Sequence, residues 1–436
     1  MKKICTLLLL LVGVCAQIHC APGQFVTVRN GRFYQGEKPY TFVGTNFWYG
    51  AILASEGQGG NRKMLKKQLD LMQKYGIDNL RILVGGDGPE GDPSQIRPTL
   101  QKEPGVYNDT ILQGLDYLMA ELEKRGMKAV LYLNNAWDWS GGFNQYLQWA
   151  GMGTPPSSKD WTGWQAYTSQ FVRNEKARQL SARHTRYVVS RINTVTGQPY
   201  KDSPALMAWE LCNEPRPFAT TPEQKVYFTS WIKEQSELIK SIDPNHLVTT
   251  GSEGKYGCES DMELFRTIHS LPSIDYCCIH IWPFNWSWLG GYFATIEEAL
   301  KGIGEEAPEK SVGRACEETK AYIDEAYRYV EGTGKPIVLE EFGYPRDKFK
   351  FDRKSTTHAR DTYYKYIFDI IRTSGKIQGC NFWSWAGCAR PVHPFWQPWD
   401  DYTGDPAQEE QGLNSVFDTD KSTLKLIKDF SRKKGK

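Results

Sequence analysis

Two segments of this sequence end an apolar run in acidic residues and are the best suited to chemistry. The segment AWELCNEPR, residues 208–216, changes at Asn213-Glu214 from a strand-like pattern to an amide, a carboxylate and a proline. The segment KPIVLEEFGYP ends its own apolar run at Glu340-Glu341. A carboxylate at a strand end is most often a surface or ion-pairing residue. Two of them on the same rim of a sheet, however, would form a reactive pair.

Paired carboxylates can cleave a glycosidic bond. One is held protonated and gives its proton to the leaving oxygen, and the other is ionised and attacks or stabilises the anomeric carbon. Strand alternation predicts that one of Glu340 and Glu341 faces the rim and the other faces the helices. A metal site is an alternative use of such a pair, but the seven histidines are scattered and form no ligand cluster. We therefore expect no metal.

Eight apolar, β-rich runs alternate with amphipathic segments and must position these residues. The predicted strands are 40–46, 79–84, 128–134, 205–212, 247–251, 275–282, 336–343 and 379–385. Helical periodicity is present between strands at 61–76, 107–126, 236–242 and 356–375. Eight repeats of this kind favour an α/β protein of the (β/α)8 TIM-barrel class over an open, doubly wound sheet. No glycine-rich phosphate loop follows the first strand, so no nucleotide cofactor is expected.

Three long loops follow predicted strands, at 137–164, 283–300 and 386–412, and would lie on the C-terminal face of the barrel. Barrel enzymes build their sites on this face. Tryptophans gather in or next to these loops, in the contexts NAWDWSGG, HIWPFNWSW and FWQPWDDY. Core packing is the commoner role of tryptophan, but exposed rings among Asp, Asn, Gly and Pro suit stacking on sugar rings.

The strand-end motifs, in this order, resemble those of the clan A retaining glycoside hydrolases, and family 5 in particular. They are Arg81 in NLRIL, then NEP, HIW, EFG and FWSWAG after the fourth, sixth, seventh and eighth strands. The resemblance covers nearly the whole chain beyond its first residues. It implies that Glu214 is the general acid/base and that Glu341 is the nucleophile.

The resemblance also implies the substrate-binding residues. Asn213 would bond the sugar 2-OH, and Arg81 would lie under Glu341 and keep it ionised. His280 would form a neutral wall beside Glu214, although a strand-end histidine can equally be structural. Trp383 is expected as the platform under the sugar, with a core role as its alternative, and the other expected contacts are Trp282, Trp137, Asn46 and Trp48.

Several segments are similar to the β-mannanase branch of the family. They are HIWPFNW, LNNAWDWSGG and INTVTGQPYKDSPALMAWELCNEPR. Where many members have His-x-Tyr, this chain has His280-Ile281-Trp282, and an indole N–H can donate a hydrogen bond but cannot accept one. The cellulase branch more typically has a histidine where this chain has Asn134-Asn135. The resemblance implies internal, retaining cleavage of β-1,4-linked mannan, glucomannan or galactomannan.

Other functions stay open. An endo-β-1,4-glucanase would use the same scaffold, and an inactive carbohydrate-binding barrel would usually lack one of the two carboxylates. An inverting mechanism would need carboxyl groups about 6.5–9.5 Å apart, instead of about 5–5.5 Å for a retaining one. A formal net charge of +2 without charged blocks favours neither nucleic acid nor an anionic membrane as a partner. A monomer is expected.

The N-terminus predicts export. Residues 1–21 combine two lysines with an apolar stretch too short to span a membrane, as in a secretory signal peptide. Cleavage is expected after Ala16, and lipid attachment at Cys15 or Cys20 is the alternative. Residues 22–436 would then form a single catalytic domain, secreted or held at the surface or in the periplasm of a bacterium. Seven cysteines follow; most are expected as buried thiols, with disulfides conceivable among Cys258, Cys316, Cys380 and Cys388.

Overall fold

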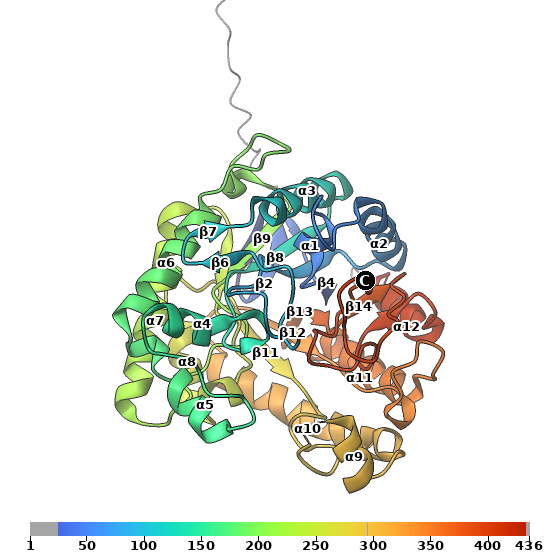
Figure 1. Cartoon of the computed structure of the whole chain (residues 1–436). Helices are drawn as coiled ribbons and strands as arrows, with labels where there is room; N and C mark the ends of the chain where they lie inside the picture. Colours follow the sequence, from blue (N-terminus) through green and yellow to red (C-terminus); the bar gives the residue numbers. More distant parts are fainter. Residues whose placement is uncertain (1–24, 294, 433–436) are drawn as a thin grey trace, which may run out of the picture.

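The computed structural model describes residues 25–293 and 295–432, so the predicted leader lies outside the described residues. Eight parallel strands form one curved sheet, with helices outside it (Figure 1). They are β4 (Phe42–Asn46), β5 (Asn79–Leu83), β8 (Lys128–Tyr132), β9 (Leu206–Glu210), β10 (Leu247–Thr249), β11 (Cys277–Ile281), β12 (Ile337–Phe342) and β13 (Ile377–Phe382). All eight predicted strands are confirmed.

The sheet closes on itself. Its order is β10-β9-β8-β5-β4-β13-β12-β11, and hydrogen bonds join the two outer strands or their extensions. Asp275 N donates to Val248 O at 2.8 Å, and His280 N donates to Glu253 O at 3.1 Å. The result is the predicted TIM barrel, in which the C-terminal ends of the strands share one rim.

Helices follow the strands, and most of them cover the outside of the barrel. They are α1 (Gly50–Leu53), α2 (Arg62–Tyr75), α3 (Asp109–Arg125), α4 (Gly142–Trp149), α5 (Trp161–Thr168), α6 (Glu175–Val189), α7 (Pro222–Ile242), α8 (Met262–Ser270), α9 (Ile296–Gly302), α10 (Ala307–Val330), α11 (His358–Ser374) and α12 (Lys421–Ser431). Helix α2 shows the local logic, because Asn61 Oδ1 accepts from Met64 N at 2.9 Å and Gly76 ends the helix at φ 76°. No described helix is long and apolar enough to cross a membrane.

A small antiparallel sheet, absent from the sequence prediction, covers the N-terminal end of the barrel. Its strands are β1 (Val26–Arg29), β2 (Arg32–Gln35) and β3 (Lys38–Pro39). Val26 and Phe33 pack against barrel residues such as Phe42 and Val338. The interior is therefore filled at this end, and the opposite rim is left for the site.

The C-terminal face also carries short elements inside the long loops. These are β6 (Gln101–Glu103) and β7 (Val106–Tyr107), β14 (Trp385–Gly387) and β15 (Val416–Phe417), and 3-10 turns at Asp138–Ser140, Phe171–Arg173, Tyr256–Cys258 and Asp347–Phe349. A further 3-10 turn, Tyr200–Asp202, directly precedes β9 and lies at its N-terminal end. All seven cysteines between residues 25 and 432 are buried. Cys258, Cys316 and Cys388 are free thiols, so no disulfide forms among the four candidates.

Candidate active site

Glu214 and Glu341 meet at the C-terminal rim, as predicted. Glu341 belongs to β12, and Glu214 follows β9 after a short irregular segment. One carboxylate oxygen of each, together with one ring nitrogen of His280, lie within 4.8 Å of one another. A pair this close leaves no room for a water molecule between nucleophile and sugar. It fits the separation of about 5–5.5 Å expected for a retaining glycosidase and not the wider spacing of an inverting one.

The prediction that one glutamate of the Glu340-Glu341 pair faces the helices is wrong. Opposite β11 the register shifts, so that Ile279 pairs with Leu339 but His280 pairs with Glu341. Glu340 is the extra residue of this β-bulge, and its Oε1 accepts a 3.0 Å hydrogen bond from the buried Tyr276 hydroxyl. A bulge interrupts the period-two alternation. Both carboxylates therefore turn inward, Glu340 into the barrel and Glu341 onto its rim.

Arg81 lies beneath the pair, fully buried, and joins four side chains. Its guanidinium donates to Glu341 Oε1, to both oxygens of Glu210, to Asn46 Oδ1 at 3.0 Å and to Asn213 Oδ1 at 2.8 Å. The fork geometry of arginine suits such simultaneous contacts. The predicted position of Arg81 under the nucleophile is thus what the structure shows. Asn46 supports this arginine and donates to Glu340 O at 2.9 Å.

Three nitrogen atoms surround the carboxylates at the rim. Trp137 Nε1 donates to Glu214 Oε2 at 2.5 Å, and Trp282 Nε1 donates to Glu341 Oε2 at 3.1 Å. His280 Nδ1 lies 2.8 Å from Glu214 Oε1 and 3.4 Å from Glu341 Oε2. Trp282 therefore supplies Glu341 with a hydrogen-bond donor, the role that the resemblance implies for a tyrosine hydroxyl in many family members.

Burial sets the protonation of this cluster. It raises the pKa of Glu214 and of Glu341, because neither anion can be fully solvated. A charge on either carboxylate disfavours a charge on the other, so the pair tends to keep one proton. Arg216 and Arg81 both favour the anion at Glu214 through space, but only Glu341 is hydrogen-bonded to a cation, Arg81, and on this contact we assign the anion to Glu341 and the proton to Glu214. Burial also lowers the pKa of His280 to about 4, so its ring is neutral at pH 7.

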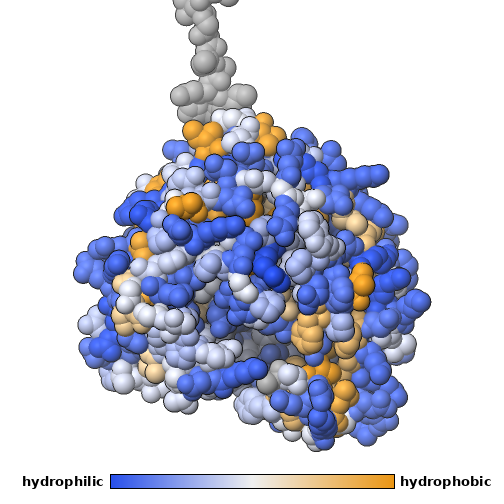
Figure 2. Space-filling view, viewed as in Figure 1, coloured by the Kyte–Doolittle hydropathy of each residue, from blue (hydrophilic) through white to orange (hydrophobic). Residues whose placement is uncertain are grey.

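The pair opens into a cavity of about 1170 Å³ on the C-terminal face. Figure 2, viewed in the same direction as Figure 1, shows a hollow near the middle of a largely hydrophilic surface. Glu214, Glu341 and Asn213 line this cavity together with the tryptophans Trp137, Trp139, Trp161, Trp282, Trp286 and Trp383. Arg81, His280 and Asn46 support the carboxylates from below and are not among the lining residues.

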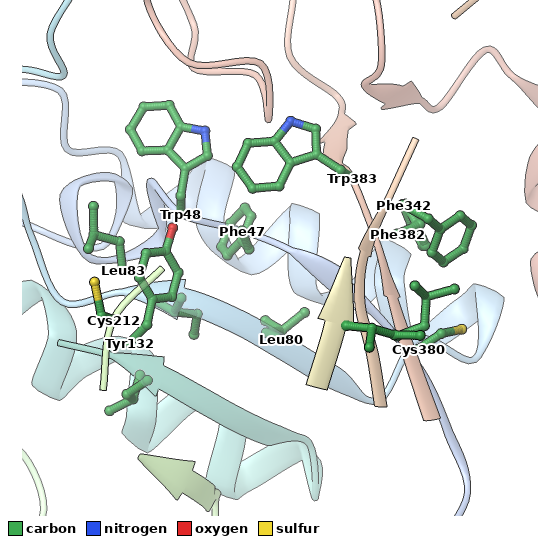
Figure 3. Packing of buried hydrophobic residues seen from close by; sticks show 14 of the residues in the cluster. Phe47, Trp48, Leu80, Leu83, Tyr132, Cys212, Phe342, Cys380, Phe382 and Trp383 are labelled. Atoms are coloured by element: carbon green, nitrogen blue, oxygen red, sulfur yellow. The ribbon is translucent and has the colours of Figure 1, made fainter. Parts of the chain in front are cut away.

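Trp383 and Trp48 differ in their surroundings. Trp383 borders the cavity, is only 4% exposed, and has a buried indole N–H without a hydrogen-bond partner among the described residues. Trp48, labelled with Trp383 in Figure 3, donates its indole N–H to Gly404 O at 2.9 Å and does not line the cavity. Trp48 thus supports the loop after the eighth strand, and its expected contact with substrate stays a prediction.

Several residues of the site were not predicted from the sequence. Glu210 binds Arg81 from inside β9, and Arg216 forms a bidentate ion pair with Glu253 at the cavity wall. Glu409 also lines the cavity, and one of its carboxyl oxygens is buried without a hydrogen-bond partner in the described residues. Glu210, Arg216 and Glu253 are charged residues near strand ends, which is a weak signal of function in a sequence. Glu409 lies late in a long loop, and its position gave no such signal.

These observations define a class of protein. Glu214, His280 and Glu341 are close enough to hold a cation, but Arg81 and Trp282 already donate to both oxygens of Glu341. The geometry instead suits a protonated acid beside an anionic nucleophile on a TIM-barrel rim. The molecule is a glycoside hydrolase of the retaining, two-carboxylate type.

Comparison with known proteins identifies the family of this glycoside hydrolase. Residues 23–436 match the family described as GH family 5 beta-mannosidase-like, and the chain belongs to this family. The putative mannan endo-1,4-beta-mannosidase 9 of Oryza sativa subsp. japonica is 30% identical, over 96% of this chain and 91% of that protein.

Two solved structures show the same fold. The glycoside hydrolase family 5 mannosidase of Rhizomucor miehei is 30% identical, with a TM-score of 0.81, over 94% of this chain and 97% of that one. An endo-1,4-beta-D-mannanase of Thermotoga petrophila is 24% identical, with a TM-score of 0.65, over 90% of this chain and 99% of that one.

Proposed function

We propose that this chain cleaves internal β-1,4-mannosidic bonds of mannan, glucomannan or galactomannan by double displacement. The main support for this proposal is the proximity of Glu214 and Glu341, since one oxygen of each lies within 4.8 Å of the other. Glu341 attacks the anomeric carbon while Glu214 gives its proton to the leaving oxygen. Glu214 then takes a proton from water, which attacks the glycosyl ester and releases Glu341.

The shape of the cavity supports internal cleavage. Aromatic side chains lie along it well beyond the carboxylates, including Trp161, which is 45% exposed, and Tyr292, which is 74% exposed. Exposed rings of this kind suit a chain of sugars that continues past the cleaved bond. The plant relative, named a mannan endo-1,4-beta-mannosidase, supports mannan as the substrate.

Removal of single mannose units from a chain end is the second candidate. It is favoured by the Rhizomucor miehei mannosidase, which matches this fold with the higher TM-score of the two solved structures described above. The two modes differ in how fast a polymer shortens. Internal cleavage lowers the viscosity of glucomannan after few bonds are broken, whereas removal of end units releases reducing sugar with little change in viscosity.

The test follows viscosity and reducing ends together on galactomannan, glucomannan and carboxymethyl-cellulose. We expect the wild type to thin the mannans early, and Glu214→Gln and Glu341→Gln to lose nearly all activity. Cleavage of only the cellulose derivative would change the assignment to a glucanase. Sugar binding without cleavage would make the chain a carbohydrate-binding barrel.

We further propose that residues 1–21 direct export, that 22–436 form a single domain, and that it acts outside the cytoplasm as a monomer. The apolar leader sequence supports export. Expression of the full chain in a bacterial host, followed by N-terminal sequencing of the exported protein and light scattering, tests this. An unprocessed chain that stays in the cytoplasm would contradict it, and a dimer would contradict the monomer.

A further inference from the structure

Three indole rings form a compact group beside Glu214. The ring centroids of Trp137 and Trp164 are 5.3 Å apart, with 13° between their planes, and those of Trp161 and Trp164 are 5.3 Å apart, with 10° between their planes. Trp137 and Trp161 are 6.1 Å apart, with 20° between their planes. Trp164 is fully buried and donates to Asp138 Oδ2 at 3.2 Å, whereas Trp137 and Trp161 line the cavity.

The distances show how the rings are arranged. Three successive stacked layers would place the outer two rings about 7 Å apart, because aromatic faces cannot approach closer than about 3.5 Å. All three separations are shorter than this, at 5.3, 5.3 and 6.1 Å. Two rings must therefore lie side by side, and the widest pair is Trp137 and Trp161. Buried Trp164 backs both of them.

This two-ring floor lies on the side of the site where the leaving group departs. Trp137 donates to Glu214, the residue that protonates the leaving oxygen, and Trp161 extends the floor beyond it. The ring of Phe218 is nearly perpendicular to those of Trp137 and Trp164, with centroids 5.8 and 5.2 Å away, and packs against both. The floor is thus rigid before any ligand binds, which reduces the entropy that a ligand must lose.

We propose that Trp137 and Trp161 form a platform for two consecutive hexose units on the leaving-group side of a β-1,4-linked chain, with Trp161 under the more distant unit. The flat, apolar faces of such sugars match adjacent indole rings, and stacking removes the exposed surface of Trp161 from water. This inference rests on the proposed function for the direction of the chain, and it adds a binding position to the site.

The experiment compares Trp161→Ala with wild type on reducing-end-labelled mannopentaose and on an aryl β-mannobioside. The aryl substrate has no sugar on the leaving side. We expect kcat/KM on the pentaose to fall about five- to tenfold, which is the scale of one aromatic contact. Cleavage should shift toward the labelled reducing end, where fewer sugars lie over the floor, and kcat/KM on the aryl substrate should change less than twofold.

Two further variants make the comparison specific. Trp161→Phe keeps a ring and should recover part of the loss. Trp399→Ala removes a tryptophan that is 88% exposed and does not line the cavity. It should leave kcat/KM unchanged on both substrates. An equal loss on both substrates, or an unchanged cleavage position, would overturn the platform.

Failure of the proposed function gives a different result. If wild type cleaves cellopentaose but not mannopentaose, the mannan assignment fails and the same comparison is made on cellopentaose. If neither is cleaved, equilibrium binding of the two pentaoses to wild type and to Trp161→Ala decides. Equal affinities would then refute the platform.

Discussion

At the scale of single residues, the two carboxylates of the site share one proton, and their different neighbours determine which of them carries it. Glu341 accepts from Arg81 and Trp282, while Glu214 accepts from Trp137 and contacts the neutral ring of His280. Arg81 is hydrogen-bonded to Glu341, whereas Arg216 acts on Glu214 only through space, and this difference favours separate roles for the two carboxylates. These contacts support the proposed roles of Glu214 as the acid and Glu341 as the nucleophile.

The two roles predict different losses. Glu214→Gln should lower kcat on manno-oligosaccharides about 10²- to 10⁴-fold, because the leaving oxygen no longer receives a proton. On a 2,4-dinitrophenyl mannoside, whose leaving group needs no proton, the first step should stay fast and give a burst of phenol. Glu341→Gln should abolish both reactions. Glu297→Gln, an exposed surface change, serves as the control, and a burst from Glu341→Gln would reverse the assignment.

Arg81→Met should destabilise the fold as well as the site. It would leave Glu210 and Glu341 buried without their cation, at a cost of about 3–5 kcal/mol in the free energy of unfolding. Urea unfolding measures this. The matched change Arg173→Met breaks an exposed ion pair with Glu223 and should cost under about 1 kcal/mol. Equal costs for the two variants would show that the buried network is not structural.

At the scale of elements, strand ends and their irregularities decide where the chemistry lies. The eight strands were predictable because each is a short apolar run bounded by turns or helical periodicity. The β-bulge at Glu340 was not, because the alternation rule assumes a regular ladder. The small N-terminal sheet and helix α5 were also missed; their segments are short, and packing on the barrel stabilises them more than local pattern does. The longer helices α6 and α10 were expected only as the helix that follows a strand, without bounds.

Gly251, after β10, holds the strand end that carries Glu214. Its carbonyl accepts from Glu214 N at 2.9 Å, its φ is 79°, and a Cβ there would overlap the carbonyl oxygen of Cys212. Gly251→Ala should therefore lower both kcat and the melting temperature. Gly197→Ala has a similar φ of 72° with open space around it, and should cost only about 1–2 kcal/mol of backbone strain. Equal effects of the two changes would contradict this role.

At the scale of the whole molecule, buried ionisable groups predict where acid unfolds the protein. Burial lowers the pKa of His184 and His280 to about 4 and of His269 to about 3, from 6.5. Unfolding must therefore take up protons below pH 6.5, and stability falls as the pH falls toward 3. Burial raises the pKa of Glu210 and Glu340, which has the opposite effect, but only above their ordinary value near 4.5.

Above pH 4.5 the histidines and the glutamates change the free energy of unfolding in opposite directions as the pH falls. Below pH 4.5 only the decrease caused by the histidines continues. We expect the free energy of unfolding in urea to drop most steeply between pH 4.5 and 3, by about 1.4 kcal/mol per pH unit for each linked proton. A constant or rising free energy in this range would contradict the neutral, buried state of these histidines.

The location of the site in the overall architecture was largely predictable from the sequence. A barrel of eight strands places all their C-terminal ends on one rim, so Arg81, Glu214, His280, Glu341 and Trp383 had to converge once the strands were known. The depth of each residue was not predictable, because burial depends on the loops packed above it. Trp48 and Trp161 show this, since Trp48 is covered by the loop after the eighth strand and Trp161 is exposed at the cavity.

The configuration of the first product tests the proposed double displacement by Glu214 and Glu341. Proton NMR of mannopentaose during the first minutes of hydrolysis, before mutarotation, distinguishes the anomers formed. Because one oxygen of each carboxylate lies within 4.8 Å of the other, we expect the β-anomer to appear first and the α-anomer to follow slowly. Initial formation of the α-anomer would mean a single inversion and would contradict the assignment of Glu341 as a nucleophile.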